Sequence, residues 1–294
     1  MIYDTFLFFN ELELLELRLR ELSGVVDRFV IVESPRTHSN QPKPLVFAAH
    51  RDRFREFDSQ ILHVIVEDDP ATLQGWSPTG PRRFAIEDHD RRSIGRGLAG
   101  CRPDDVILTG DVDEIPRAEV LRSAVAAMRF RTDPLARAWS WLLRQPPVVR
   151  HARSLFKKRH PKVTVFEQRM FYYFLNCACA NRPWWTGTRM VFFRDFTSAY
   201  DLRRWGGRRV PDAGWHFSFM GGVERIRAKI AAYAHTEYNR PEFTDPEEIA
   251  RRIGPGRDLL GDGTELEWVP MDDSQPRWLR EHPDRFAAWL GPPA

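Results

Sequence analysis

Short apolar runs that suit buried β-strands alternate with helical patterns through the first half of the chain. The runs cover Ile2–Phe9, Phe29–Val32, Ile61–Val66 and Val106–Leu108. Asn10 stands where the N-cap of a first helix belongs, and leucines 12, 15, 19 and 22 form one stripe of that helix. Strands separated by helices in this way predict a parallel sheet with right-handed crossovers, and therefore an α/β fold.

Polar side chains follow three of these strands at the point where each strand ends. They are Asn10-Glu11, Glu33-Ser34 and the acidic stretch Asp111 to Glu114. Ligands of parallel α/β sheets bind beyond the carboxyl ends of the strands. We therefore expect these side chains to share one site.

The segment VILTGDVDEIP, residues 106–116, is the most informative stretch. Asp111 and Asp113 are two positions apart, so in an extended chain their carboxylates point to the same side. Two neighbouring carboxylates are costly unless a cation neutralises them, and a hard divalent ion suits oxygen ligands. The segment predicts a Mg²⁺ or Mn²⁺ site, or alternatively an acidic turn that caps the following helix, with Pro116 in its first turn.

The pattern changes from about Leu135 onward. Strand-like runs at Leu135–Leu142, Met170–Leu175 and Thr188–Phe193 lack long helices between them. The basic segment Arg150–Lys162 is either a solvated loop or a surface for an acidic or phosphate-bearing acceptor. Further helical patterns lie near Pro246–Ile253 and Arg277–Leu290. We expect residues 1–134 and 135–294 to form two halves of one continuous domain.

Composition and charge limit the classes of partner. The 294 residues carry a net charge of +3, which argues against nucleic-acid binding. Cys101, Cys177 and Cys179 form neither a metal-ligand spacing nor a complete disulfide framework, which favours a reduced intracellular setting. The N-terminal apolar run is interrupted by acids, so no signal peptide or membrane span is expected. Arginine greatly outnumbers lysine, as in proteins of G+C-rich genomes, and we expect a cytoplasmic bacterial protein.

Several motifs in order carry a resemblance to a known family. The strand–Asn–Glu–helix FFNELELL, the strand VDRFVIVES and the helix DRRSIGRGLAG before the Asp-x-Asp strand resemble GT-A glycosyltransferases. Together with GDVDEIP, GWHFSFMGG and AHTEYN, the chain resembles glycosyltransferase family 17 over nearly its whole length. The resemblance implies a GT-A fold, an inverting reaction, a UDP-N-acetylglucosamine donor, a saccharide acceptor and a divalent metal, usually Mn²⁺. Residues 1–134 would then bind the nucleotide-sugar, and residues 135–294 would face the acceptor.

The resemblance also implies roles for single residues. The expected nucleotide-sugar contacts are Asn10, Glu11, Glu33, Ser34, Arg91, Asp111 and Asp113. The metal would be held by Asp111 and Asp113, with His216 or His235 as a further candidate ligand. An inverting transfer needs a base for the acceptor hydroxyl, and Asp212 and Glu237 are the candidates. One departure is Asp90-Arg91-Arg92, where the family has Gln-Arg-Asn.

Two other functions stay open on the sequence alone. One is a carbohydrate-binding protein that keeps the fold without turnover. The other is a metal-dependent phosphohydrolase, because the haloacid-dehalogenase class also carries Asp-x-Asp after a strand. In that class the motif follows the first strand, whereas here it follows the fourth.

Overall fold

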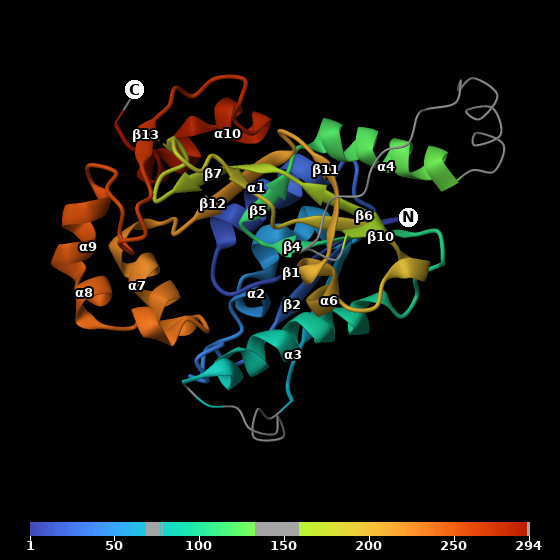
Figure 1. Cartoon of the computed structure of the whole chain (residues 1–294), viewed down its shortest axis with the longest axis horizontal. Coiled ribbons are helices and arrows are strands. Elements are labelled where there is room, and N and C mark those ends of the chain that lie inside the picture. The colour runs from blue at the N-terminus through green and yellow to red at the C-terminus, as the bar shows by residue number, and fades with distance from the viewer. Residues whose placement is uncertain (69–76, 78, 133–158, 293–294) are drawn as a thin grey trace, which may run out of the picture.

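The structure is a computed structural model, and it describes residues 1–68, 77, 79–132 and 159–292. Two mixed β-sheets with flanking helices make up this part of the chain (Figure 1). The predicted strand at Leu135–Leu142 and most of the basic segment Arg150–Lys162 lie outside the described residues. The α/β prediction is confirmed.

The first sheet has seven strands in the order β11-β6-β10-β4-β1-β2-β3. Its parallel part consists of β1 (Ile2–Leu7), β2 (Arg28–Glu33), β3 (Ile61–Ile65) and β4 (Val106–Asp111). Strand β10 (Arg189–Phe192) joins β4 and β6 (Arg159–Phe166) in antiparallel register, and β11 (Gly206–Val210) runs parallel to β6. The prediction of parallel strands is right for the first four, and strands from the second half extend the same sheet.

Helices cover both faces of this sheet. On one face, α1 (Leu12–Leu22) and α4 (Ala118–Thr132) pack against Phe6, Phe29 and Leu108. On the other face, the 3-10 helix η4 (Ile94–Leu98) and α6 (Ala199–Arg204) pack against Val30 and Ile107. Figure 1 shows α4 and α3 (Ala85–Ser93) on opposite sides of the sheet. Each leucine buried in this way contributes about 1.5–3 kcal/mol.

Two predicted helix starts are wrong by one or two residues. Helix α1 begins at Leu12, and its N-cap is Glu11 rather than Asn10. The Glu11 carboxylate folds back to accept hydrogen bonds from the amides of Phe9 (3.2 Å) and Asn10 (3.0 Å). Ile115 and Pro116 pair with β12 (Gly214–Ser218), so Pro116 is the last residue of the strand β5 (Glu114–Pro116). Helix α4 starts only at Ala118.

The second sheet has the order β13-β8-β7-β12-β5, with β9 paired to β7. Its remaining strands are β7 (Gln168–Tyr172), β8 (Cys177–Cys179), β9 (Trp184–Trp185), β12 (Gly214–Ser218) and β13 (Leu266–Trp268). Leu14 and Leu17 of α1 pack with its core residues Trp215 and Phe217, so α1 lies between the two sheets. Strand β4 belongs to the first sheet and β5 to the second, and the acidic stretch is therefore where the chain passes from one to the other.

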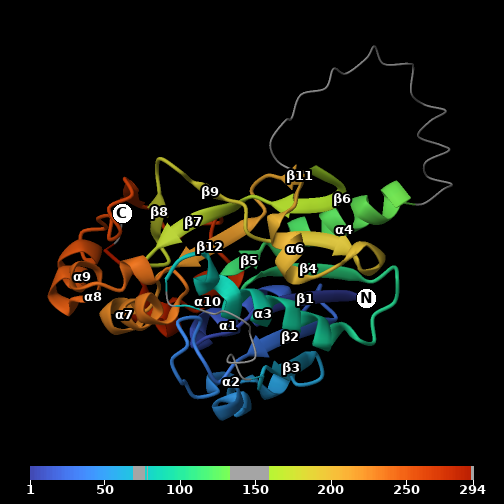
Figure 2. The same ribbon diagram turned by 60° about the horizontal axis from the view of Figure 1, so that its bottom comes forward.

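The C-terminal part packs beside the second sheet. It contains α7 (Gly222–Ala232), α8 (Pro241–Thr244), α9 (Pro246–Ile253), α10 (Arg277–Glu281) and the 3-10 helix η7 (Pro283–Trp289). Figure 2 shows α7, α8 and α9 together at one end of the molecule, next to β8. The pattern expected at Arg277–Leu290 is split at His282, whose backbone leaves the helical region (φ −135°, ψ 51°) ahead of Pro283.

Short elements complete the description. They are α2 (Val46–Ala49) and the 3-10 helices η1 (Arg51–Phe57), η3 (Pro81–Phe84), η5 (Phe193–Asp195) and η6 (Thr236–Tyr238). Among the described helices, none combines the length and the apolar character needed to span a membrane. Cys101, Cys177 and Cys179 are free thiols.

Candidate functional site

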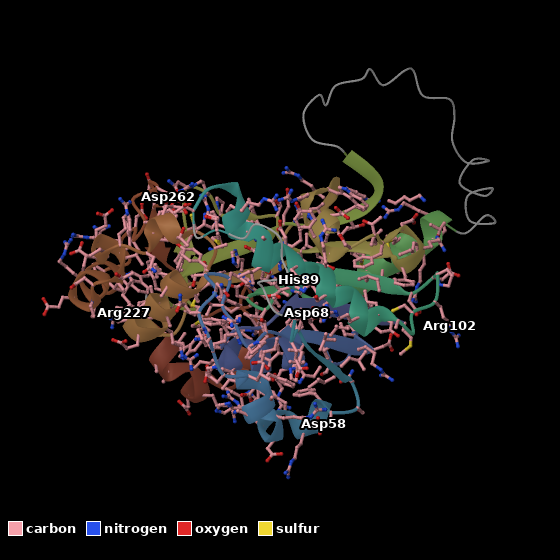
Figure 3. The ribbon with its side chains drawn as sticks, turned by 90° about the horizontal axis from the view of Figure 1, so that it is seen from below. Asp58, Asp68, His89, Arg102, Arg227 and Asp262 are labelled. Atoms are coloured by element: carbon pink, nitrogen blue, oxygen red, sulfur yellow. The ribbon has the colours of Figure 1, made fainter. Side chains whose placement is uncertain are left out.

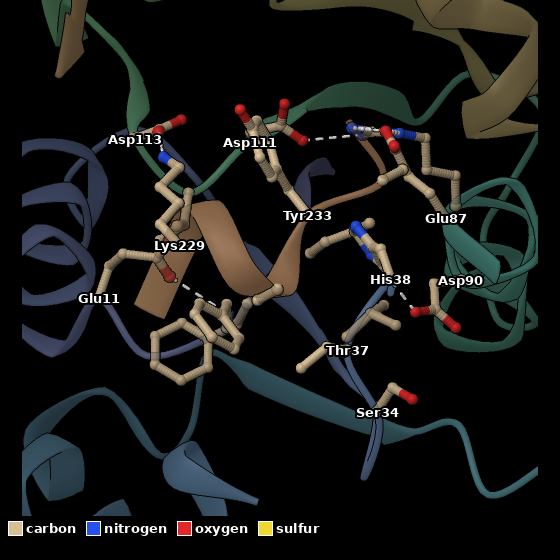
Figure 4. A pocket seen from close by; sticks show the side chains of 18 of the residues that line it. Glu11, Ser34, Thr37, His38, Glu87, Asp90, Asp111, Asp113, Lys229 and Tyr233 are labelled. Carbon is tan, nitrogen blue, oxygen red and sulfur yellow. Dashed lines mark hydrogen bonds and ion pairs between the residues drawn. The ribbon is translucent and has the colours of Figure 1, made fainter. Parts of the chain in front are cut away.

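A cavity of about 370 Å³ opens at the carboxyl ends of β1, β2 and β4 (Figure 4). Because these three strands are parallel, their ends meet at one edge of the sheet. Seven residues predicted for the site line this cavity: Glu11, Ser34, Arg91, Asp111, Asp113, His216 and His235. The cavity is therefore the place where the strand-end residues and the late histidines come together.

Asp111, at the end of β4, lies between two guanidinium groups. Its Oδ1 accepts a hydrogen bond from Arg91 Nη1 and its Oδ2 accepts one from Arg203 Nη2, both at 2.8 Å. Burial alone would raise the pKa of this carboxyl, but Arg203 and Arg91 outweigh burial and hold it well below its usual range. Asp111 is therefore ionised at neutral pH.

Asp113 is paired with a lysine from a distant helix. Lys229 of α7 donates to Asp113 Oδ2 at 2.8 Å, and His216 Nε2 of β12 lies 3.6 Å from Oδ1. Figure 4 shows the Lys229 side chain directed at Asp113. Burial opposes the charge of both partners, but their attraction prevails, so the pKa of Asp113 is lowered and that of Lys229 is raised.

Glu114 is buried and its carboxylate has four hydrogen-bond donors. Arg203 approaches it with two nitrogens at 2.7 and 3.0 Å, Trp185 Nε1 donates at 2.7 Å, and the Asp111 amide donates at 3.0 Å. A carboxylate satisfied in this way serves as an anchor for the groups that donate to it. Arg203 thus ties α6 to both Asp111 and Glu114.

A fully buried arginine holds the backbone of the same stretch from below. Arg18 of α1 pairs with Asp4 through two bonds of 2.7 and 2.6 Å. Its Nη1 donates to the carbonyls of Asp111 (2.8 Å) and Glu114 (2.7 Å). The chain turn between the two sheets is therefore fixed from the core side as well as from the cavity side.

Away from Asp113 the cavity is lined by Ser34, Thr37, His38 and Asp90 (Figure 4), and Phe8, Phe9 and Lys43 also line it. His38 Nε2 lies 3.5 Å from Asp90 Oδ2, on the side of the cavity away from Asp113 (Figure 4). Burial favours neutral His38, but its hydrogen bond to Asp90 and the charge of Glu87 raise its pKa. Together these lining residues combine aromatic rings with donors and acceptors, a combination suited to a base and a ribose.

Helix α3 supplies several cavity residues, and it is attached to the end of β3. Asp68 lies beside His89 of α3 (Figure 3), with 2.8 Å between the His89 Nε2 and Asp68 Oδ2 atoms. Arg96 of η4 pairs with the same carboxylate. Glu87 lies one helical turn before Arg91 on α3. It accepts a hydrogen bond from Arg91 at 2.8 Å and orients this side chain toward Asp111.

The amino-terminal segment of the chain matches a known family. Residues 1–126 match the model of the family described as Glycosyltransferase family 17. The predicted resemblance to family 17 is confirmed. The matched segment contains the strand-end residues up to Asp113, whereas the family-17 motifs around His216 and His235 lie beyond it and line the same cavity.

Three curated relatives share one name, beta-1,4-mannosyl-glycoprotein 4-beta-N-acetylglucosaminyltransferase. The human protein is 28% identical over 97% of this chain and 54% of its own length. The rat and mouse proteins are 27% and 26% identical over the same share of this chain and 53% of their own length. The chain thus spans about half the length of the curated relatives it matches.

A solved structure gives a weaker likeness. The inositol-1-phosphate CTP transferase from T. maritima is 10% identical, with a TM-score of 0.32, over 71% of this chain and 84% of that one. A score of this size establishes no shared fold. The α/β architecture of this chain rests on its own two sheets.

Four predicted residues lie outside the cavity lining: Asn10, Glu33, Asp212 and Glu237. The Glu33 carboxylate is buried and accepts a hydrogen bond from the Phe47 amide at 2.9 Å, so it caps α2. Asp212 is 64% exposed and pairs with Arg117 at 3.2 Å. Glu237 bonds His235 Nδ1 at 2.9 Å and Arg83 at 3.2 Å, so it borders the cavity without lining it.

The acids fit a divalent ion only in part. Carboxylate oxygens with an imidazole suit Mn²⁺ or Mg²⁺ chemically. However, no group of three or more His, Cys, Asp or Glu side chains among the described residues is placed to hold a metal ion. Asp111 and Asp113 already face Arg91, Arg203 and Lys229. An ion at Asp113 would require Lys229 to move away, with further ligands from a bound molecule.

Two residues central to the site were not predicted from the sequence: Lys229 and Arg203. Each lies in the second half and reaches the acidic stretch across a large separation in the chain. One signal was available for Lys229, because the chain has only five lysines and two of them, Lys43 and Lys229, line the cavity. Nothing in the local sequence distinguishes Arg203 from the neighbouring arginines.

Proposed function

We propose that this chain is an inverting glycosyltransferase of the GT-A type. It transfers a sugar, most simply N-acetylglucosamine, from a UDP-sugar to a hydroxyl group of a saccharide acceptor. The observation that carries the proposal is the Asp111-Val112-Asp113 stretch in a cavity where Arg91, Arg203 and Lys229 gather. The names of the family and of the curated relatives support the same reaction class.

The cations are placed to receive a diphosphate. Guanidinium and ammonium groups are the side chains that recognise phosphate oxygens. Their charges face the carboxylates of Asp111 and Asp113. A bound diphosphate would share these cations, and they would stabilise the negative charge that develops on the departing UDP.

The volume of the cavity suits the rest of the donor. Its volume of about 370 Å³ is in the range of small-molecule sites. The end near Phe8, Ser34 and His38 would hold uridine, and the end near Asp113, His216 and Trp185 would hold the sugar. Glu11 and Ser34 keep their predicted role as nucleoside contacts in this proposal.

A divalent ion, Mn²⁺ or Mg²⁺, is part of the proposal. Asp113 and His216 would hold it, with Asp111 nearby and with oxygens of the donor completing its ligands. When bound, such an ion offsets charge on the leaving diphosphate. His235 is less suited as a ligand, since its ring bonds Glu237 and packs on Tyr233.

The base for the acceptor hydroxyl is proposed to be Glu237 rather than Asp212. Glu237 contacts His235, which lines the cavity, whereas Asp212 faces solvent beside Arg117. A positioned carboxylate contributes roughly 10²–10⁴-fold to such a transfer. Glu237 is ranked before Asp212 because it contacts a residue of the cavity lining.

The phosphohydrolase alternative meets an obstacle at Asp111. That chemistry uses the first acid of Asp-x-Asp as a nucleophile, which needs a free oxygen. Both oxygens of Asp111 accept hydrogen bonds from arginines.

The test is UDP release by the purified chain, measured with Mn²⁺ over a panel of UDP-sugars and simple saccharide acceptors. Turnover with UDP-N-acetylglucosamine and a loss of about 10²–10³-fold in Asp113→Ala are expected. Asp212→Asn is the control that leaves the cavity unchanged. If no UDP-sugar binds or turns over, and Asp113→Ala equals the wild type, the proposal is wrong.

A further inference from the structure

We propose that the indole ring of Trp185 is a stacking platform for a pyranose ring at the Asp113 end of the cavity. The inference rests on the proposed function, because it assigns the place of a sugar within the same site. The sugar is either the one being transferred or the acceptor sugar next to it. Both present the same chemistry, a ring face of C–H groups that packs on an aromatic ring.

Trp185 differs from the other tryptophans near the site in what its ring faces. It lines the cavity and remains 38% exposed. Trp215, on strand β12, is 1% exposed and belongs to the core of the second sheet. Trp184 is 49% exposed but does not line the cavity. Trp185 therefore presents a large apolar surface inside a concave polar site.

The orientation of the Trp185 ring is fixed from two sides. Its Nε1 donates to Glu114 Oε1 at 2.7 Å, and Glu114 is held in turn by Arg203. Its ring also packs on His216, with 5.0 Å between ring centroids and 35° between the planes. A ring held in place before the ligand arrives loses little freedom on binding, which favours affinity.

Gly187 makes this arrangement possible. A Cβ atom at Gly187 would lie 1.9 Å from Glu114 Oε1 and 2.3 Å from Trp185 Nε1. Any larger residue would therefore force the Trp185 indole and the Glu114 carboxylate apart. The contact between Trp185 and Glu114 therefore depends on glycine at position 187.

The position of the platform relates it to the reacting end of the donor. His216 contacts Trp185 on one side and lies 3.6 Å from Asp113 on the other. A sugar ring on Trp185 is thus next to the Asp113–Lys229 pair, where the diphosphate is proposed to bind. The uridine end, near His38 and Asp90, is at the opposite side of the cavity.

The experiment compares Trp185→Ala and Trp185→Phe with Trp184→Ala as the matched control. Binding of UDP, UDP-N-acetylglucosamine, methyl β-D-mannopyranoside and N,N′-diacetylchitobiose is measured by calorimetry and saturation-transfer NMR. Trp185→Ala should bind UDP normally but lose about tenfold in affinity for a sugar-bearing probe. Trp185→Phe should keep most of that affinity, and Trp184→Ala all of it.

The probes separate the two sources of the sugar. Loss confined to UDP-N-acetylglucosamine, relative to UDP, assigns the platform to the transferred sugar. Loss confined to the two free saccharides assigns it to the acceptor. Wild-type affinity of Trp185→Ala for every sugar-bearing probe would overturn the platform, even with normal UDP binding. If the wild type binds no UDP, the proposed donor fails, and the free saccharides alone decide whether Trp185 binds sugar.

Discussion

Arg18 and Asp4 form an ion pair with both side chains fully buried, directly beneath the acidic stretch of the cavity. The remaining nitrogen of Arg18 donates to the carbonyl oxygens of Asp111 and Glu114. Burying this ion pair costs desolvation energy. The hydrogen bonds that Arg18 donates to the two carbonyl oxygens offset part of that cost. The pair thus fixes the turn that carries the carboxylates, and the cavity depends on a contact that lies in the core.

Replacing Arg18 with methionine should destabilise the protein strongly. The change leaves Asp4 buried without its partner and frees two carbonyls of the acidic stretch, so a loss of about 3–5 kcal/mol is expected. Urea unfolding followed by circular dichroism measures it. Arg20→Met is the control on the same helix, because Arg20 pairs with Glu56 at the surface and should change stability by less than about 1 kcal/mol. Equal losses in the two variants would contradict the role of Arg18.

Replacing Lys229 with methionine should weaken UDP binding. The change removes the ammonium group next to Asp113 and leaves an unpaired carboxylate where the diphosphate is proposed to bind. A loss of about thirtyfold in affinity, roughly 2 kcal/mol, is expected from calorimetry. Arg227→Met serves as control, since Arg227 lies on the same helix and pairs with Glu224 at the surface.

The same variant should alter the acid side of the stability curve. The pKa of Asp113 is lower in the folded protein than its ordinary value of 3.8 in the unfolded chain. Ionised Asp113 therefore stabilises the fold above that ordinary value, and this stabilisation is lost as the pH falls through the folded pKa. Without Lys229 the folded pKa of Asp113 rises and its difference from the unfolded value shrinks, so the unfolding free energy of Lys229→Met should fall less than that of the wild type as the pH drops below about 4. Acid unfolding curves of Lys229→Met and wild type that coincide would count against this pairing.

Replacing Arg203 with lysine should reduce turnover although the charge is kept. Arg203 bonds Glu114 with two nitrogens and Asp111 with one of them, and a lysine ammonium cannot reproduce this planar geometry. A fall of about tenfold or more in kcat/KM is expected. Arg204→Lys is the neighbouring control, because Arg204 packs on the Tyr200 ring away from the acidic stretch. Unchanged kcat/KM in Arg203→Lys would show that the bidentate contact is dispensable.

The sequence was informative where a local pattern decides the structure. Asp111, Glu11 and Ser34 could be placed at one site because parallel strands bring their carboxyl ends to one edge. Lys229 and Arg203 could not be placed, since their approach depends on how α7 and α6 pack on the first half. Likewise, an acid in a loop such as Asp212 has no local feature that tells a cavity residue from a surface ion pair.

The family resemblance covered part of that gap. It pointed to His216 and His235, which lie far from Asp113 in the chain but line the same cavity. It did not reveal that Asp111 and Asp113 are each paired with cations of the protein. This pairing depends on side-chain positions from α3, α6 and α7, which no motif in a single strand encodes.

Charged His38 should stabilise the fold at mildly acidic pH, and this stabilisation should disappear in mild alkali. Burial lowers its pKa and Arg91 opposes its charge, but the hydrogen bond to Asp90 and the charge of Glu87 raise the pKa above 6.5 overall. A raised histidine pKa stabilises the fold below the unfolded value, and this stabilisation is lost as pH rises through the folded value. Because the side chain is 26% exposed, solvent screening limits the effect to about 0.5 kcal/mol.

The measurement is the difference in unfolding free energy between wild type and His38→Gln at about pH 5.5 and about pH 8.5, on either side of the ordinary histidine range. The difference should be larger at the lower pH, where His38 is charged and paired with Asp90. His50→Gln is the control, because the His50 ring lies at the surface and bonds the Val46 carbonyl at 2.8 Å. A difference that stays constant between the two pH values, or that grows in alkali, would mean that His38 is not held in its charged form by Asp90.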